Sequence, residues 1–377
     1  MSSSGESVRA FAGSLSLEQT LEKVIERIID REMKRKKIGE ALANLREVDL
    51  DAMSGVAEKT LFKEVEMDPL VDVRVCGVDG SLLDQQLHGF DLILVRALAV
   101  IFHYRGAVLA GVEYSPSELP PPKLIDVAEP LDSWEFQVLA GMERQLAEIE
   151  IAVQVAERGG VESIMLDGSI VPQYVERFPR SPILLERYQN LIRAYMRLYQ
   201  VCAEAGIVLA GAVKDSRGTR FVEILKEAFD RFNLEKEDVL ILDKTKDTVL
   251  LNHVLRVGER TSAFTYVERP ASYVLSDLGG WGERIYGFYI RTVPFDRPLR
   301  IEFLKGVEDA AETADRVASL VYALSSHHEE FGLPSVIIEA DASARLAEEE
   351  LSWVRDIISA RLDPAFAPDL RRERKPF

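Results

Sequence analysis

An Asp-Gly-Ser stretch follows an apolar run twice in this sequence. The first copy, Asp79–Ser81, follows residues 71–78, and the second, Asp167–Ser169, follows residues 162–166. Both runs have the composition of β-strands, so each aspartate is predicted where a strand ends. If the two strands are neighbours in one sheet, about 4.8 Å apart, the carboxylates can share divalent cations. Asp-Gly after a strand is also ordinary turn chemistry, and that alternative stays open.

The composition is typical of a folded protein in a reducing compartment. The chain has 377 residues, of which 47% are hydrophobic, enough for two domains or for one domain with insertions. Its only cysteines, Cys76 and Cys202, stand in apolar surroundings and are predicted to be buried thiols. The longest apolar run, 92–102, contains Arg96 and is too short to span a bilayer, and the N-terminus lacks a signal-peptide pattern. We therefore expect a cytoplasmic protein with no membrane partner.

The charge balance limits how the chain could bind nucleic acid. There are 63 acidic and 46 basic residues, and the formal net charge is −17. Such a chain does not coat a polyanion through bulk charge. Any nucleic acid must instead meet a local basic groove or bound metal ions.

The first half of the chain predicts an α/β fold. Strands at 71–78, 92–104 and 107–114 are predicted to form an antiparallel meander, because Arg105-Gly106 is a turn signal. The first strand, 71–78, and the fourth, 162–166, can then lie side by side in parallel. The elements predicted after the meander are a helix at 131–158, a strand at 162–166, a helix at 183–205 and a strand at 207–213.

The second half and the two ends are less regular. A hairpin is predicted where residues 291–298 connect two strands. A helix from Ser16 has an apolar face that we expect to pack against the rest of the protein. The basic cluster at 33–37 on this helix reads as a solvated face, and a nucleic-acid patch is the alternative. A loose basic tail is predicted at 363–377. The other predictions are helices at 219–232, 247–257, 309–325 and 335–350 and strands at 239–242, 264–267, 285–292 and 299–304.

Taken in this order, the elements resemble the NurA family of prokaryotic DNA nucleases. The resemblance rests on a strand ending in Val-Asp79-Gly-Ser, a meander, an acidic helix, a strand ending in Leu-Asp167-Gly-Ser and a later strand ending in Lys214, and it covers about 70–345. It implies an RNase H-like mixed sheet, with antiparallel and parallel strands flanked by helices and with helical additions at both ends. The implied division is an N-terminal helical extension at 1–65, a nuclease domain at 66–350, and a C-terminal helix and basic tail at 351–377.

The resemblance also implies a carboxylate site that uses manganese or magnesium. Asp79 and Asp167 would be metal ligands, and the family's helix glutamate would match Glu148, with Glu143 and Glu150 as alternatives. Independently of the family, hydrolysis by two metal ions needs several carboxylates from different elements, and these residues supply them.

Two residues at the end of the later strand complete the predicted catalytic set. Lys214 could stabilise charge that develops on a phosphate, although a solvated strand-end lysine is the ordinary alternative. Asp215, next to it, could be an additional metal ligand.

The sequence departs from the family near its C-terminus. Leu333 and Asp341 stand where the family usually has a tyrosine and a histidine. Asp341 can still bind a metal through oxygen and is counted among the predicted ligands, but it cannot act as an imidazole near neutral pH. His327 and His328 are expected to be solvated at a helix end. The departure leaves open a weakened activity or another pH and metal preference.

The family's activity and partners follow from the resemblance alone. It implies 5′-3′ exonuclease and single-strand endonuclease activity in DNA end resection and double-strand break repair, a homodimer, and a partnership with a HerA-type hexameric ATPase. Neither polarity nor strand preference can be read from the residues. Two alternatives remain: an actin-like or sugar-kinase-like phosphotransferase, which also places Asp-x-Gly motifs after strands, and a NurA-like subunit that has lost hydrolysis.

Overall fold

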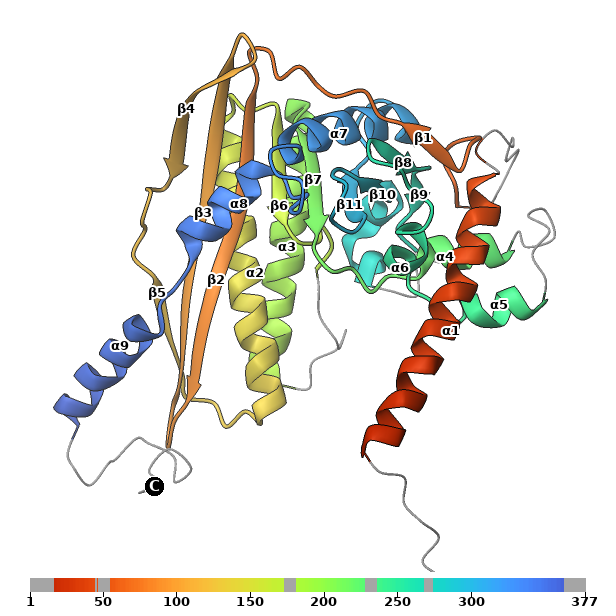
Figure 1. The fold of residues 1–377 in the computed structure, drawn as a ribbon. Coiled ribbons are helices and arrows are strands. Elements are labelled where there is room, and N and C mark those ends of the chain that lie inside the picture. Colours follow the sequence, from red (N-terminus) through yellow and green to blue (C-terminus); the bar gives the residue numbers. More distant parts are fainter. Residues whose placement is uncertain are drawn as a thin grey trace, which may run out of the picture.

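A single mixed sheet forms the centre of the molecule (Figure 1). The computed structural model describes residues 17–44, 46, 55–172, 181–227, 236–267 and 274–362. Within these residues the strand order is β1-β8-β10-β11-β7-β6-β2-β3-β4, with β5 beside β3 and β9 beside β10. The strands are β1 (Phe62–Glu64), β2 (Arg74–Gln86), β3 (Asp91–Arg105), β4 (Val108–Ser115), β5 (Lys123–Val127), β6 (Ser163–Asp167), β7 (Val208–Val213), β8 (Glu259–Thr261), β9 (Phe264–Thr265), β10 (Ile285–Arg291) and β11 (Leu299–Leu304).

The strand pairing confirms the predicted topology. β2, β3 and β4 form the antiparallel meander, and β10 and β11 form the predicted hairpin. β6 runs parallel to both β2 and β7, so the first and fourth predicted strands are neighbours. This parallel centre brings the ends of β6 and β7 to the same edge as Asp79.

Helices cover both faces of the sheet. α2 (Ser133–Arg158) and α3 (Pro182–Ala205) pack on one face, and α7 (Ala310–Ser325) and α8 (Ser335–Ala344) pack on the other. α2 begins at a capping box formed by Asp132 and Glu135, and its C-cap is Gly159, close to the predicted bounds. The remaining helices are α1 (Leu17–Ala43), α4 (Arg220–Glu227), α5 (Lys236–Leu242), α6 (Asp247–Leu251), the 3-10 helix η3 (Val274–Arg284) and α9 (Glu348–Arg361).

The predicted strand at 239–242 is wrong, because these residues form the end of helix α5. A four-residue apolar run fits either a strand or one side of a short helix. Leu242 is buried against the cluster that contains the end of α1, whereas Leu240 is 65% exposed. One-sided burial of this kind is what a short amphipathic helix needs.

The predicted helix at 335–350 is broken into α8 and α9. Arg345 and Ala347 have extended backbone ψ angles of 129° and 143°. The break is held from β2 and β3, because the Ser81 hydroxyl accepts a hydrogen bond from the Leu346 N–H at 3.1 Å and Arg96 donates to the Arg345 carbonyl at 2.9 Å. These long-range contacts have no signal in the local sequence.

Other boundaries also differ from the predictions. β2 does not end at Asp79 but continues to Gln86. The predicted strand at 264–267 is reduced to β9, the helix at 247–257 to α6, and the helix at 219–232 to α4, with 228–232 outside the described residues. The short strands β1, β5 and β8 were not predicted. β1 lies within the predicted extension 1–65, yet it pairs with β8 and so joins the sheet.

Helical additions are present at both ends, as predicted (Figure 1). The apolar face of α1 packs against the rest of the protein, as expected, but only near its C-terminal end. Only Ile38, Gly39 and Leu42 are buried, whereas Leu21 and Ile28 are 55% and 45% exposed. The cluster at 33–37 is a solvated face with local ion pairs such as Lys34–Asp30 at 2.8 Å. The predicted basic tail at 363–377 lies outside the described residues.

Two predictions from composition can also be compared with the structure. Cys76 and Cys202 are both buried free thiols, as expected. No helix among the described residues is long and apolar enough to cross a membrane.

Candidate metal centre

The two Asp-Gly-Ser stretches meet at the edge where β2 and β6 separate. Their parallel register ends with Val78 opposite Leu166, so the next residues, Asp79 and Asp167, stand at the same level. Asp167 is the last residue of β6, as predicted. At Asp79, β2 loses its pairing with β6 but stays paired with β3, where Asp79 lies opposite Leu98.

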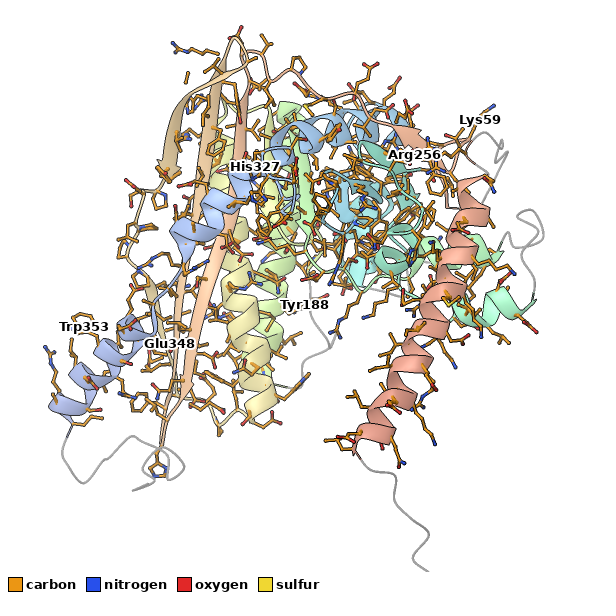
Figure 2. All side chains as sticks on the ribbon, in the orientation of Figure 1. Lys59, Tyr188, Arg256, His327, Glu348 and Trp353 are labelled. Atoms are coloured by element: carbon orange, nitrogen blue, oxygen red, sulfur yellow. The ribbon has the colours of Figure 1, made fainter. Side chains whose placement is uncertain are left out.

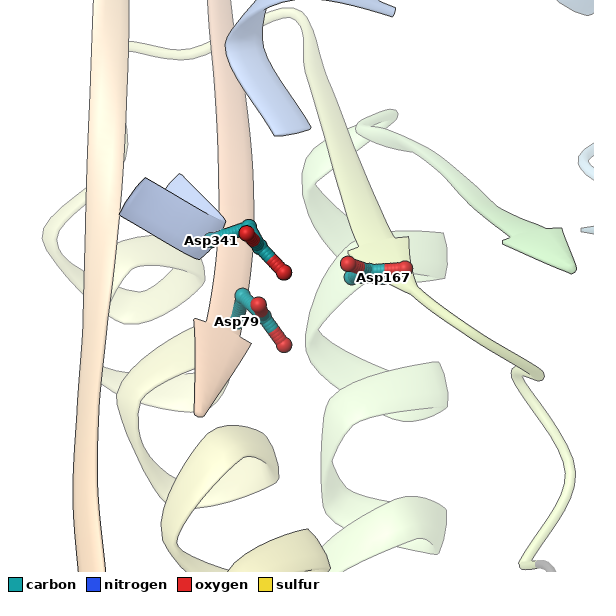
Figure 3. A group of neighbouring side chains, drawn as sticks. All are labelled: Asp79, Asp167 and Asp341. Carbon is teal, nitrogen blue, oxygen red and sulfur yellow. The ribbon is translucent and has the colours of Figure 1, made fainter. Parts of the chain in front are cut away.

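Asp341 joins these two aspartates from α8. The three residues can each offer a carboxylate oxygen such that the three atoms lie within 4.8 Å of one another, and Figure 3 shows the side chains gathered at one point. α8 can approach this closely because Gly77 has no side chain, since a Cβ there would lie only 2.5 Å from the Val336 carbonyl oxygen. The residue that departs from the family pattern is therefore part of the cluster.

Glu148 approaches from the opposite face of the sheet, on α2. Its side chain lies against Gly80, where a Cβ would be 2.8 Å from the Glu148 Cγ atom. Glu148 is buried and forms an ion pair with Arg144, one helical turn earlier. Glu143 instead pairs with Lys123 at 3.4 Å and Arg187 at 2.7 Å, and Glu150 is exposed. Of the three glutamates, the geometry favours Glu148.

Burial and mutual repulsion make this cluster hold protons unusually strongly. Burial, followed by the charge of Asp167, raises the pKa of Asp79 to about 7. Burial raises the pKa of Glu148 to about 8, and the charge of Asp79 adds to this while Arg144 opposes it. The pKa of Asp167 is also raised by burial, although Lys214 lowers it. Divalent cations are the counter-charge that such a set of hard oxygen ligands fits.

Lys214 lies beside the cluster at the end of β7. Its Nζ atom is 2.5 Å from Asp167 Oδ2 and 3.6 Å from Asp341 Oδ1. Burial alone would lower the pKa of Lys214, but its hydrogen bond to Asp167 and the nearby carboxylate charges raise it. Lys214 therefore stays protonated and supplies a positive charge next to the carboxylates.

The structure does not bring Asp215 to the cluster. Its φ of +47° is left-handed, its side chain is 84% exposed, and it pairs with Arg297 at 3.2 Å. Leu333 is buried, and it lines a cleft together with Lys214. His327 and His328 are exposed after α7, as expected; Figure 2 labels His327. Sequence reasoning missed Arg144, whose signal was its spacing of four residues before Glu148.

A comparison with models of protein families identifies the family of the chain. The family model of the NurA domain matches residues 73–346. The chain belongs to the NurA family. The match lies within the predicted region 66–350 and has almost the same bounds as the resemblance seen in the sequence.

Solved NurA structures share the fold at low sequence identity. The NurA nuclease from Sulfolobus solfataricus is 13% identical with a TM-score of 0.53, covering 90% of this chain and 97% of that one. A structure of NurA bound to dAMP and manganese is 11% identical with a TM-score of 0.52, covering 93% and 98% of the two chains. A structure of NurA with manganese is 9% identical with a TM-score of 0.52, covering 93% and 100%. No curated protein matches the sequence.

Proposed function

We propose that the protein is a deoxyribonuclease that hydrolyses phosphodiester bonds with two manganese or magnesium ions. The observation that carries this proposal is the convergence of Asp79, Asp167 and Asp341 within 4.8 Å at a sheet edge. Glu148 adds a fourth carboxylate from the other face. Family membership and the manganese-bound relatives support the same chemistry.

The residues of the site have separate roles in this proposal. Asp79, Asp167, Asp341 and Glu148 would hold the cations, which when bound would supply an activated water and charge stabilisation for the leaving oxygen. Lys214 places its ammonium beside Asp167, where it can stabilise the charge of the reacting phosphate. Arg144 orients Glu148 and offsets its charge. Asp215 lies outside this set in the present geometry, so a ligand role for it would require the loop to move.

DNA is the proposed substrate, with 5′-3′ exonuclease and single-strand endonuclease activity in end resection. The relative with bound dAMP supports a deoxynucleotide ligand. We also propose a homodimer and a HerA-type ATPase partner. The exposed apolar face of α1, including Leu21, Ile25 and Ile28, supports an interface at this end of the molecule. The actin-like alternative receives no support from the family match.

End-labelled single- and double-stranded DNA provides the test of this function. We expect cleavage with manganese or magnesium and none in EDTA. Digestion from the 5′ end should release a 5′ label as a mononucleotide at once, whereas a 3′-labelled strand should shorten gradually. Cleavage that persists in EDTA would exclude the metal mechanism, and no cleavage under any condition would favour the subunit that has lost hydrolysis.

Light scattering and binding assays test the proposed partners. A dimer at micromolar concentration and binding to a HerA-type ATPase from the same source are the expected results. A monomer, or no binding to that ATPase, would contradict the corresponding proposal.

A further inference from the structure

A cleft of about 780 Å³ opens beside the carboxylate cluster. It lies between the loop after β7, the start of α6, the β10–β11 turn and residues 331–333, and we call it the basic cleft after its lining residues Lys214, Arg217, Lys246 and Arg297. Lys214 also contacts Asp167 and Asp341, so one side chain belongs to both the cluster and the cleft. A ligand in this cleft would therefore lie next to the reacting phosphate.

Two cations of the basic cleft are available to a ligand. Arg217 and Lys246 are exposed, and neither forms an ion pair with any described residue. Of the two acidic groups of the cleft, Asp215 pairs with Arg297, whereas the Asp296 carboxylate accepts, among the described residues, only backbone N–H groups, from Gly332 at 2.8 Å and Arg297 at 2.7 Å, and keeps its charge. The two cations Arg217 and Lys246 therefore outnumber the one uncompensated carboxylate of the cleft. In a chain of net charge −17, a cleft with an excess of positive charge is a focused site for an anion.

Two exposed aromatic rings line the same cleft. Phe295 is 71% exposed and Phe331 is 46% exposed. A single exposed ring is ordinary on a protein surface, but two exposed rings that line one cleft give a ligand an apolar surface to cover. Nucleic-acid bases stack on aromatic rings whatever their sequence, and proteins that bind single strands combine such rings with a basic groove.

The wall that carries these rings is held in place by hydrogen bonds. The Phe295 N–H donates to the Glu329 carbonyl at 3.0 Å. The Thr292 hydroxyl donates to the Gly332 carbonyl at 2.9 Å. The turn that carries Phe295 and the segment that carries Phe331 are thus tied together, which keeps the backbone of both on the same wall of the cleft.

We propose that the basic cleft binds single-stranded DNA next to the bond that is cleaved, with phosphates on Arg217 and Lys246 and bases stacked on Phe295 and Phe331. This inference rests on the proposed nuclease function and adds to it the path of the substrate strand. A duplex cannot expose its bases to these rings, so the cleft selects an unpaired strand.

The first test measures how the affinity for DNA depends on salt. The full-length protein would be titrated onto a fluorescein-labelled oligothymidylate in EDTA by fluorescence anisotropy at several salt concentrations. Arg217→Ala/Lys246→Ala should weaken binding at least about tenfold, and it should reduce the slope of log K against log salt by about 1.4, since each phosphate contact on a single strand contributes about 0.7. The matched control Lys23→Ala/Arg105→Ala removes one exposed lysine and one exposed arginine that do not line the cleft and should bind as the wild type does.

The second test uses the rings. Phe295→Ala and Phe331→Ala should each weaken binding about tenfold. Phe295→Leu keeps an apolar side chain without a ring and should remain as weak as Phe295→Ala. If these variants bind DNA normally but lose binding to a HerA-type ATPase, the rings belong to a protein interface and the proposal is overturned.

A small diester separates this inference from the proposed function. With manganese, the cleavage rates of the wild type and of Arg217→Ala/Lys246→Ala would be measured on single-stranded DNA and on bis(p-nitrophenyl) phosphate. The small diester has no strand to fill the cleft. The ratio of the two rates should fall at least about tenfold in Arg217→Ala/Lys246→Ala. An unchanged ratio would overturn the cleft assignment alone, whereas a wild type that cleaves neither substrate would overturn the nuclease function.

Discussion

The two Asp-Gly-Ser stretches have the same residues but different structural roles. Asp79–Ser81 lies inside β2, where Gly80 leaves space for Glu148 and Ser81 fixes the break between α8 and α9. Asp167–Ser169 lies where β6 ends, and Gly168 there has a φ of +120°. Only the aspartates share a role, because both project into the same cluster. A repeated motif can therefore mark one chemical site without marking a repeated local structure.

The two aspartates also differ in their surroundings. Asp79 is buried, and burial and the charge of Asp167 raise its pKa to about 7. Asp167 has Lys214 at 2.5 Å, which partly offsets the effect of burial on its pKa. With a pKa of about 7, Asp79 is partly protonated at neutral pH without metal, and a bound cation would have to displace that proton.

The largest effect is expected from the shared part of the motif. Asp79→Asn and Asp167→Asn should each reduce metal-dependent DNA cleavage by well over about a hundredfold, since even the partners of metal ligands are worth about 10- to 100-fold. Each change removes a ligand charge at constant volume, so the fold should stay nearly intact. Cleavage of labelled DNA and thermal melts in EDTA would be measured on the same samples. Unchanged cleavage in either variant would contradict the two-metal assignment.

Substitutions of Gly80 and Gly168 should separate an effect on cleavage from an effect on backbone stability. Gly80→Ala places a methyl group against Glu148 and should reduce cleavage about tenfold or more. Its effect on the free energy of unfolding should be smaller than that of Gly168→Ala. Gly168→Ala meets no atom within 4 Å but forces alanine to a φ of +120°, which should cost about 1–3 kcal/mol of stability. Denaturant unfolding and cleavage rates would be compared. Equal effects of the two changes on both quantities would show that the glycines act alike.

Metal and pH should reveal the buried carboxylates. The folded-state pKa values of Asp79 and Glu148, about 7 and 8, lie above the ordinary values of 3.8 and 4.5. The folded state therefore binds more protons than the unfolded state between about pH 4 and pH 8, and the stability of the metal-free protein should fall as pH rises through that window. Manganese should raise the melting temperature more at pH 8 than at pH 5. A manganese concentration a hundred times the dissociation constant should raise the free energy of unfolding by about 2.7 kcal/mol.

Asp341 provides the matched variants for that experiment. Asp341→Ala should shrink the increase in melting temperature with manganese, raise the melting temperature in EDTA, and weaken cleavage less than Asp79→Asn does. Asp341→His should keep cleavage but lose it as pH falls through about 6.5, where imidazole becomes protonated. If Asp341→Ala changed neither the manganese effect nor the cleavage rate, the residue would lie outside the working site despite its position.

The sequence predicted what depends on local pattern. Apolar strands and amphipathic helices carry their period in the residues, so the meander, the parallel pair, α2 and α3 could be predicted, and the two aspartates followed from the ends of strand pairing. The break at Arg345 could not be predicted, because Arg96 and Ser81 hold it from distant strands. The choice among the helix glutamates depended on Gly80, and the basic cleft depends on loops far apart in the chain.

The smallest effect on cleavage is expected from the serines, which act through hydrogen bonds outside the carboxylate cluster. Ser81→Ala removes the acceptor for the Leu346 N–H and should cost about 1 kcal/mol of stability, as loss of one hydrogen bond does. Ser169→Ala leaves the buried Glu302 carboxylate without the Ser169 hydroxyl and also removes the acceptor for the Val171 N–H, so it should cost more, about 1–3 kcal/mol. Neither serine belongs to the cluster.

The position of Asp341 makes the two serine variants distinguishable in activity. Leu346 follows α8, so loss of its hydrogen bond to Ser81 lets the end of the helix that carries Asp341 shift. Ser169 follows the end of β6 and holds neither α8 nor Leu346. Ser81→Ala should therefore raise the manganese concentration needed for half-maximal cleavage a few-fold, and Ser169→Ala should leave it near the wild-type value despite the larger loss of stability. Manganese titrations of cleavage and urea unfolding of both variants test this. The opposite order in metal requirement would mean that the second stretch, rather than the first, positions the cations.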